Sequence, residues 1–210
     1  MGKIEITKKV LGICATNCYT VVDTETKEAL IIDPADREDV LIRDWKDKGV
    51  TPQAVLLTHG HFDHIGALAG VKKEYPDIKV YAAAKEKEVM ESPTLNLSSS
   101  FGAAFTAQAD IYLEDGAEIE VLGRTCKCLL VPGHTKGGMC YYFPEEKVVF
   151  TGDTLFCYSV GRTDFPTGDA KALEEAIREK LFTLPDETLV LPGHDIQTMI
   201  GKEKKGNPYF

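Results

Sequence analysis

The sequence lacks the features that mark nucleic-acid-binding, membrane-spanning and disulfide-stabilised secreted proteins. Its 24 basic residues are outnumbered by 33 acidic ones, for a formal net charge of −9, whereas contacts with nucleic-acid phosphates need a basic surface. It has no apolar run of transmembrane length and no secretory signal. None of its six cysteines forms a C-x-x-C pair, and a chain of this size does not need disulfides to fold. We therefore expect a cytoplasmic protein with reduced cysteines and with no nucleic-acid or membrane partner.

Histidine is also scarce, and most of it stands in one short segment. Three of the five histidines, with one aspartate, follow the apolar residues 54–57 in the run T-H-G-H-F-D-H, as His59, His61, Asp63 and His64. On a helix, at about 100° per residue, these four side chains would share no face, and on a strand His64 would point away from the other three. We therefore expect a loop that leaves the end of a buried strand, with Gly60 letting the backbone curl around a metal ion.

The two remaining histidines and one aspartate stand in the same relation to apolar runs. His134 and His194 each follow a hydrophobic run and a Pro-Gly pair, and Asp153 follows the run 148–152. Polar residues that merely crowd surface turns would not all fall just past the ends of strands. The pattern therefore predicts a metal centre built from several strand ends.

The number of candidate ligands indicates more than one ion. A catalytic zinc-like ion takes about three protein ligands and keeps one position for water. Seven candidates fit two ions with three ligands each and one shared carboxylate: His59, His61, Asp63, His64, His134, Asp153 and His194. We assign the sharing to Asp153 because a carboxylate can bridge two ions and an imidazole cannot. Two ions about 4 Å apart with a hydroxide between them form a hydrolytic site.

Hydrophobic periodicity and turn residues outline an α/β chain that we interpret as one domain, residues 1–210. Strands are expected over 4–10, 17–23, 29–33, 54–57, 78–83, 111–131, 139–143, 147–150 and 189–191, some of them joined by turns at 115–116 and 144–146. Helices are expected over 37–48, 65–75, 85–91 and 169–181, the first capped by Asp36 and the last by Asp169. Residues 92–109 show no clear period and are expected to form a long loop or a helical flap. Two facing mixed sheets with helices outside, and the site along one edge between them, accommodate this order.

With H-x-H-x-D-H followed in order by His134, Asp153 and His194, the chain resembles the metallo-β-lactamase-fold hydrolases over essentially its whole length. The resemblance implies a four-layer αββα sandwich of two mixed β-sheets with helices on the outer faces. It also implies which residues hold each ion: His59, His61 and His134 the first, Asp63, His64 and His194 the second, with Asp153 bridging and Asp33 supporting the site from behind. β-Lactamases of this fold have a cysteine at the position of Asp153, so the resemblance does not predict antibiotic hydrolysis.

Within this superfamily the chain is most similar to the glyoxalase II (hydroxyacylglutathione hydrolase) group. The resemblance is carried by G-H-T at 133–135, T-G-D-T-L-F at 151–156, G-R-T-D-F-P at 161–166 and N-P-Y-F at 207–210. Full-length glyoxalase II has a further C-terminal helical region that helps to bind glutathione, whereas here only sixteen residues follow His194. Ile196 replaces a usual substrate-binding tyrosine and Lys136 a usual proline. These departures indicate the short, single-domain form.

The expected reaction is hydrolysis of a small-molecule thioester of the hydroxyacylglutathione type. Metal binding lowers the pKa of water to about 7, so a hydroxide bridging two divalent ions can attack the thioester carbonyl at neutral pH. Asp63 is the expected catalytic residue, because its free oxygen would orient that hydroxide or take its proton. Arg162 and Lys136 are the expected substrate contacts, unless Arg162 is tied to Asp164 instead. Zinc is the favoured metal, with iron or manganese as alternatives, since imidazole and carboxylate suit all three.

Two other interpretations compete with the hydrolase. Persulfide dioxygenases also resemble the run G-R-T-D-F at 161–165, and in them a single iron on residues such as His59, His61 and Asp153 would activate oxygen. Gly193 favours the hydrolase, because the dioxygenases tend to have alanine before the last histidine. The third interpretation is a non-catalytic metal-binding protein, and the complete ligand set argues against it.

Overall fold

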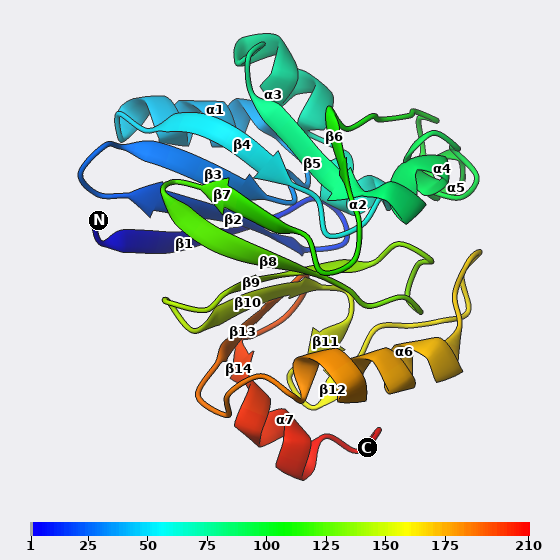
Figure 1. Cartoon of the computed structure of the whole chain (residues 1–210). Helices are drawn as coiled ribbons and strands as arrows, with labels where there is room; N and C mark the ends of the chain where they lie inside the picture. The colour runs from blue at the N-terminus through cyan, green and yellow to red at the C-terminus, as the bar shows by residue number, and fades with distance from the viewer. Residues whose placement is uncertain (1) are drawn as a thin grey trace.

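Two six-stranded β-sheets face each other in the computed structural model, which describes residues 2–210 (Figure 1). The first sheet has the strand order β1-β2-β3-β4-β5-β6. Its strands are β1 (Ile4–Leu11), β2 (Thr16–Asp23), β3 (Glu28–Ile32), β4 (Thr51–Leu56), β5 (Lys79–Ala83) and β6 (Ile111–Leu113). Strands β1 to β3 pair antiparallel, and β3 to β6 pair parallel, so this sheet is mixed.

The second sheet is built from the later part of the chain, in the order β14-β13-β10-β9-β8-β7. Its strands are β7 (Glu118–Val121), β8 (Arg124–Leu130), β9 (Met139–Phe143), β10 (Val148–Gly152), β13 (Leu189–Pro192) and β14 (Thr198–Met199). Only β10 and β13 pair parallel within it, so this sheet is mixed as well. A small hairpin of β11 (Leu155–Phe156) and β12 (Ser159–Val160) follows β10.

Helices cover the outer faces of both sheets, which gives the predicted four-layer αββα sandwich (Figure 1). On the side of the first sheet lie α1 (Glu38–Asp47), α2 (Phe62–Ile65), α3 (Leu68–Glu74), the 3₁₀ turn η1 (Ala84–Glu86), α4 (Lys87–Met90) and α5 (Ser98–Phe101). On the side of the second sheet lie α6 (Ala170–Ala176), its continuation as a π-helical turn η2 (Ile177–Leu181), and α7 (Ile200–Gly206). No helix among residues 2–210 is both long enough and apolar enough to cross a membrane.

Continuous apolar strands arise because the sheets are covered on both faces. In β3, Ala29 and Ile31 pack toward the helices while Leu30 and Ile32 pack toward the second sheet. Each leucine or isoleucine buried in this way stabilises the fold by about 1.5–3 kcal/mol. Strands buried on both faces read as unbroken hydrophobic runs rather than as alternating ones. The ends of these strands are therefore held in a rigid setting, and the candidate ligands stand there.

Three local expectations from the sequence are wrong. The strands expected within 111–131 have the expected turn at 115–116, but a second turn that was not expected, at Leu122 and Gly123, divides them into three, and both of its residues have positive φ. The expected helix 65–75 begins earlier and is divided into α2 and α3, because the amide of Ala67 bonds the carbonyl of Pro34 instead of continuing α2. The helix α1 has no side-chain cap, whereas the cap of α6 by Asp169 is confirmed by a 3.0 Å bond from the amide of Ala172.

Candidate metal centre

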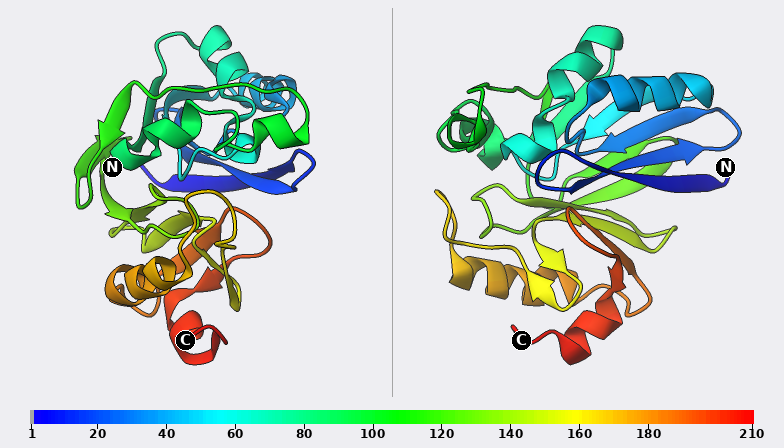
Figure 2. Two further views of the ribbon diagram at one scale, coloured as in Figure 1. Left: turned by 90° about the vertical axis from the view of Figure 1, so that its right-hand side faces the viewer. Right: turned by 180° about the vertical axis from the view of Figure 1, so that it is seen from behind.

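The candidate ligands gather at one edge of the sandwich. The loops that follow β4, β8, β10 and β13 carry them, and this edge, with α2, α4 and α5, faces the viewer in the left-hand view of Figure 2. Three overlapping groups have ligand atoms within 4.8 Å of one another: His59, His61 and His134; His59, His64 and Asp153; and Asp63, His64 and His194. The structure thus brings together all seven side chains singled out from the sequence.

Asp153 lies between the two outer groups. Its Oδ2 is 3.6 Å from Nε2 of His134 in the first group and 3.3 Å from Nε2 of His194 in the other. Its Oδ1 is 3.3 Å from Nε2 of His64. Both carboxylate oxygens therefore face imidazoles, and they do so on both sides of the cluster.

Partners behind the cluster fix the orientation of three imidazole rings. Nδ1 of His64 is 2.8 Å from Oδ2 of Asp33, and Nδ1 of His134 is 2.8 Å from the carbonyl oxygen of Arg162. Nδ1 of His59 is 3.2 Å from Oγ1 of Thr58. Each contact engages Nδ1 and leaves Nε2 for the interior of the cluster, which is the usual arrangement of histidines that bind metals.

Several buried atoms of the cluster are left without a hydrogen-bond partner. In the part of the chain that the structure describes, these include Nε2 of His59, Nε2 of His64 and Oδ1 of Asp153. A buried polar atom without a partner costs about 1–3 kcal/mol, so three of them facing one small volume need something to satisfy them. A divalent cation does so, and imidazole with carboxylate suits zinc, iron and manganese. The residues present therefore fit a metal centre.

The electrostatics of the cluster also favour a cation. Burial holds the pKa of His59 well below its usual range and lowers the pKa of His61 to about 3, which leaves both imidazoles in the neutral form that binds metals. Burial also disfavours a charge on His64, yet the carboxylates around it, Asp63 foremost, raise its pKa well above the usual range. The carboxylates thus stabilise positive charge in the space between the candidate ligands.

One family comparison covers most of the chain. Residues 11–194 match the model of the Metallo-beta-lactamase superfamily. The chain belongs to this superfamily. With its histidine-rich cluster, this member of the metallo-β-lactamase superfamily is a metal-dependent hydrolase.

Individual relatives share both sequence and fold with this superfamily member. Hydroxyacylglutathione hydrolase GloC of Haemophilus influenzae is 35% identical over 200 residues, 92% of each chain. The crystal structure of the B3 metallo-beta-lactamase BLEG-1 is 39% identical with a TM-score of 0.92, covering 98% of this chain and 99% of the other. TTHA1623, crystallised in a di-iron-bound form, is 36% identical with a TM-score of 0.85, covering 97% and 100%.

The expected course of the ligand loop is wrong in one respect. Asp63 and His64 lie in the helical turn α2 and not in an open loop, because the chain turns into the helix directly after His61. Gly60 has no positive φ; it is needed because a Cβ there would lie 2.6 Å from Cγ of Met90 and 3.2 Å from the amide nitrogen of the same residue. The glycine therefore permits close approach of the loop to α4.

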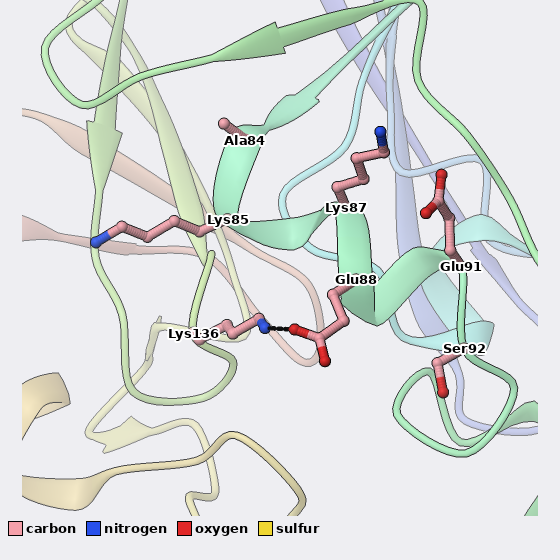
Figure 3. Close-up of a pocket in the computed structure, with 7 residues that line it drawn as sticks. All are labelled: Ala84, Lys85, Lys87, Glu88, Glu91, Ser92 and Lys136. Carbon is pink, nitrogen blue, oxygen red and sulfur yellow. Dashed lines mark hydrogen bonds and ion pairs between the residues drawn. The ribbon is translucent and has the colours of Figure 1, made fainter.

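The two residues expected to contact substrate are both engaged in ion pairs. The guanidinium of Arg162 forms two bonds with Asp164, of 2.7 and 2.6 Å, and lies 3.9 Å from the ring of Phe165. Lys136 pairs with Glu88 at the rim of a surface hollow beside α4 (Figure 3). The alternative considered for Arg162, an ion pair with Asp164, is therefore present. A substrate anion would have to displace Asp164 from the guanidinium or bind beside it.

Sequence reasoning missed two residues that contact the cluster or its loops. Thr16, the first residue of β2, donates a 2.7 Å hydrogen bond from Oγ1 to Oδ2 of Asp63. Glu86 is fully buried and bonds the loops on both sides of the site. Burial raises the pKa of Glu86 to about 7, against hydrogen bonds that lower it. A single threonine and a glutamate within the run K-E-K-E carry no signal in the sequence that would have revealed them.

Proposed function

We propose that this chain hydrolyses small thioesters of the hydroxyacylglutathione type at a centre of two divalent ions. The observation that carries the proposal is the position of Asp153 between two groups of ligands, 3.6 Å from His134 and 3.3 Å from His194. The name of the GloC relative supports the substrate class, and the di-iron form of TTHA1623 supports two ions.

In this proposal the ligands divide as the resemblance implies. His59, His61 and His134 would hold one ion and Asp63, His64 and His194 the other, with Asp153 available to both. When bound, the two ions supply a hydroxide at neutral pH and polarise the thioester carbonyl. Asp63 would relay the proton of the attacking hydroxide to the thiolate that leaves as the acyl C–S bond breaks: its Oδ2 is engaged by Thr16 and faces His194 at 3.4 Å, which leaves Oδ1 for this transfer.

The space beside Asp63 suits a small acyl group. A hollow of about 300 Å³ opens there, and the aromatic rings of Phe62 and Phe101 stack along it with centroids 4.8 Å apart. On the other side of the cluster, the ring of Phe165 packs edge-on to His61 and carries the guanidinium of Arg162. We assign the acyl group to the hollow and the anionic thiol carrier to the side of Arg162.

The surroundings of Gly193 favour the hydrolase over the persulfide dioxygenase. A Cβ at this position would lie 2.4 Å from Oδ1 of Asp153 and 2.7 Å from Cε1 of His64. The alanine typical of the dioxygenases would therefore displace the carboxylate that we assign to both ions. This packing supports a two-ion site in which residue 193 has no side chain.

Metal content and thioester turnover, measured together, test the proposal. We expect about two ions per chain and release of free thiol from S-lactoylglutathione, followed with a thiol-reactive dye. Replacing Asp153 with asparagine should abolish turnover and lower the metal content. One iron per chain with oxygen uptake on glutathione persulfide would establish the dioxygenase instead. Metal binding without turnover on any thioester or ester would establish a non-catalytic protein.

β-Lactam hydrolysis is a second candidate, favoured by one observation. The structure of BLEG-1, described as a B3 metallo-beta-lactamase, matches 98% of this chain at 39% identity. Against it stands Asp153, because β-lactamases of this fold have a cysteine at that position. The same enzyme preparation should be assayed with a chromogenic cephalosporin; turnover comparable to that of the thioester would establish it.

A further inference from the structure

Glu86 joins two loops that come from different sheets. It ends the 3₁₀ turn η1 after β5, and its side chain is completely buried. Oε1 accepts a 2.9 Å hydrogen bond from the amide of Gly60, and Oε2 accepts a 2.9 Å hydrogen bond from Oγ1 of Thr135. The amide of Gly137 donates a further bond to the same carboxylate. One side chain thus contacts the loop after β4 and the loop after β8.

The loop after β8 is shaped to reach this carboxylate. A Cβ at Gly137 would lie 2.4 Å from Oε2 and 2.5 Å from the amide nitrogen of Glu86, and a Cβ at Gly60 would lie 3.4 Å from Oε1. Backbone amides can approach a buried carboxylate this closely only where no side chain intervenes. Gly137 is therefore the glycine that the contact with Glu86 requires, whereas the tight neighbour of Gly60 is Met90.

Gly60 and Thr135, which donate hydrogen bonds to Glu86, are neighbours in the sequence of three candidate ligands. Gly60 stands between His59 and His61, and Thr135 follows His134. These three histidines form one of the groups found above, in which Nδ1 of His61 and Nε2 of His134 are 3.0 Å apart. Any change in the separation of the two loops would change this distance directly.

We propose that Glu86 is a positioning residue for the metal centre, which fixes the separation of the two histidine-bearing loops and so the geometry of the group His59, His61 and His134. The inference rests on the metal centre of the proposed function and not on its thioester substrate. Glu86 itself does not touch the ligand atoms; it acts through the backbone of one loop and the hydroxyl of the other.

A purely structural role would make Glu86 equivalent to the other fully buried glutamate, Glu203. That side chain also makes several hydrogen bonds, including 2.5 Å from Thr198 Oγ1, 2.9 Å from the amide of Tyr158 and 2.8 Å from Asn207 Nδ2. Its partners lie in β14, in the turn of the small hairpin and directly after α7, and none of them adjoins a histidine. Glu203 is therefore a matched control for burial and hydrogen bonding.

The test compares Glu86→Gln and Glu86→Ala with Glu203→Gln and Glu203→Ala in the full chain. Zinc affinity is measured by competition with a chromophoric chelator, and stability of the metal-free proteins by urea unfolding. Loss of a partner behind a metal ligand typically weakens metal affinity about 10–100-fold. We expect a loss of about tenfold for Glu86→Gln and about a hundredfold for Glu86→Ala, because glutamine keeps one acceptor. Both Glu203 variants should lose stability but bind zinc within about threefold of the parent.

Equal zinc affinity of the Glu86 and Glu203 variants would overturn the inference and leave Glu86 as a packing residue. If Glu86→Ala does not fold, the volume-conserving Glu86→Gln decides the outcome alone. The absorption spectrum of the Co²⁺-substituted proteins gives a second measurement, since altered loop separation changes the ligand field. If the parent protein turns over no thioester while its zinc affinity still depends on Glu86, the proposed substrate is wrong and this inference stands.

Discussion

Nδ1 of His61 and Nε2 of His134 lie 3.0 Å apart, although 73 positions separate them in the sequence. One residue follows β4 of the first sheet, and the other follows β8 of the second. Their rings meet nearly at right angles, with centroids 4.7 Å apart, so the two nitrogen atoms converge on a common volume. The contact forms only when the two sheets are packed, and the predictions below test how the surrounding residues maintain it.

Replacing Asp33 with asparagine should weaken metal binding without unfolding the protein. Asp33 accepts hydrogen bonds from both the amide and the hydroxyl of Thr58, at 2.8 and 2.6 Å, and it faces Nδ1 of His64 at 2.8 Å. An amide in its place presents a donor where an acceptor is needed, so the ring orientation of His64 is lost. We expect zinc affinity to fall about 10–100-fold, measured by chelator competition. The control is Asp23→Asn, which alters a buried aspartate far from the histidines and should leave affinity unchanged.

Removing the side chain of Arg162 should affect binding of anionic substrates more than catalysis. We expect Arg162→Ala to raise KM about tenfold for a thioester that carries carboxylates, with kcat little changed, since the lost interaction serves ground state and transition state alike. Asp164→Asn should lower KM, because it frees the guanidinium from its present partner. A thioester without a charged carrier serves as the comparison substrate. An increase of KM in both variants would show that the ion pair acts as a structural unit.

The pH dependence of stability should carry a contribution from Glu86. Burial raises its pKa from 4.5 to about 7, against opposing hydrogen bonds from Gly60, Thr135 and Gly137 and the charge of Lys136. The folded protein therefore retains a proton that the unfolded chain has released. This contribution to stability is complete below about pH 4.5 and is lost as the pH rises to about 7, a change of about 3 kcal/mol.

Urea unfolding of the metal-free protein between about pH 5 and pH 8 measures this contribution. The parent should lose stability relative to Glu86→Gln over that range, because glutamine has no proton to release. Parallel curves for the two proteins would mean that Glu86 is ionised throughout and that its hydrogen bonds outweigh its burial.

A methyl group at Gly137 should destabilise the protein, because its Cβ would lie 2.4 Å from Oε2 of Glu86 and 2.5 Å from the same residue's amide nitrogen. Overpacking of this kind costs about 1–3 kcal/mol, measured by chemical denaturation. Gly123→Ala is the comparison: φ there is +66° and no atom lies within 4 Å of the added Cβ, so it reports backbone strain alone, about 1–2 kcal/mol. A Glu86→Ala background should relieve only part of the Gly137→Ala defect, because the clash with the backbone nitrogen of residue 86 remains.

The predictions from sequence were best where a metal-binding residue directly follows an apolar run. Apolar runs such as 54–57 and 189–191 are local signals, and a histidine directly after each of them needs no tertiary information to be noticed. The two sheets, the four layers and the gathering of the seven side chains could therefore be predicted. The division of 111–131 between two sheets could not, because alternation is the same in either sheet and Leu122 is not a residue type that marks a left-handed turn.

Interactions made by backbone atoms or by ordinary charged residues were beyond prediction. The carbonyl of Arg162 orients His134, whereas sequence reasoning considered only its side chain. Glu86 lies in a run of alternating charges that is typical of a solvated helix, and only the packing of α4 against the two loops shows that it is buried. Such roles depend on which surfaces meet in space.

Among the described residues, the chain passes from the first six-stranded sheet to the second at residues 114–117, since β1 to β6 form the first and β7 to β10, β13 and β14 the second. Each of the three ligand groups nevertheless takes members from both sides of that connection. A protein cut there would give two polypeptides, neither of which holds a full set of ligands. Zinc would then be expected to drive their reassembly, which would make the severed chain a split reporter for the metal.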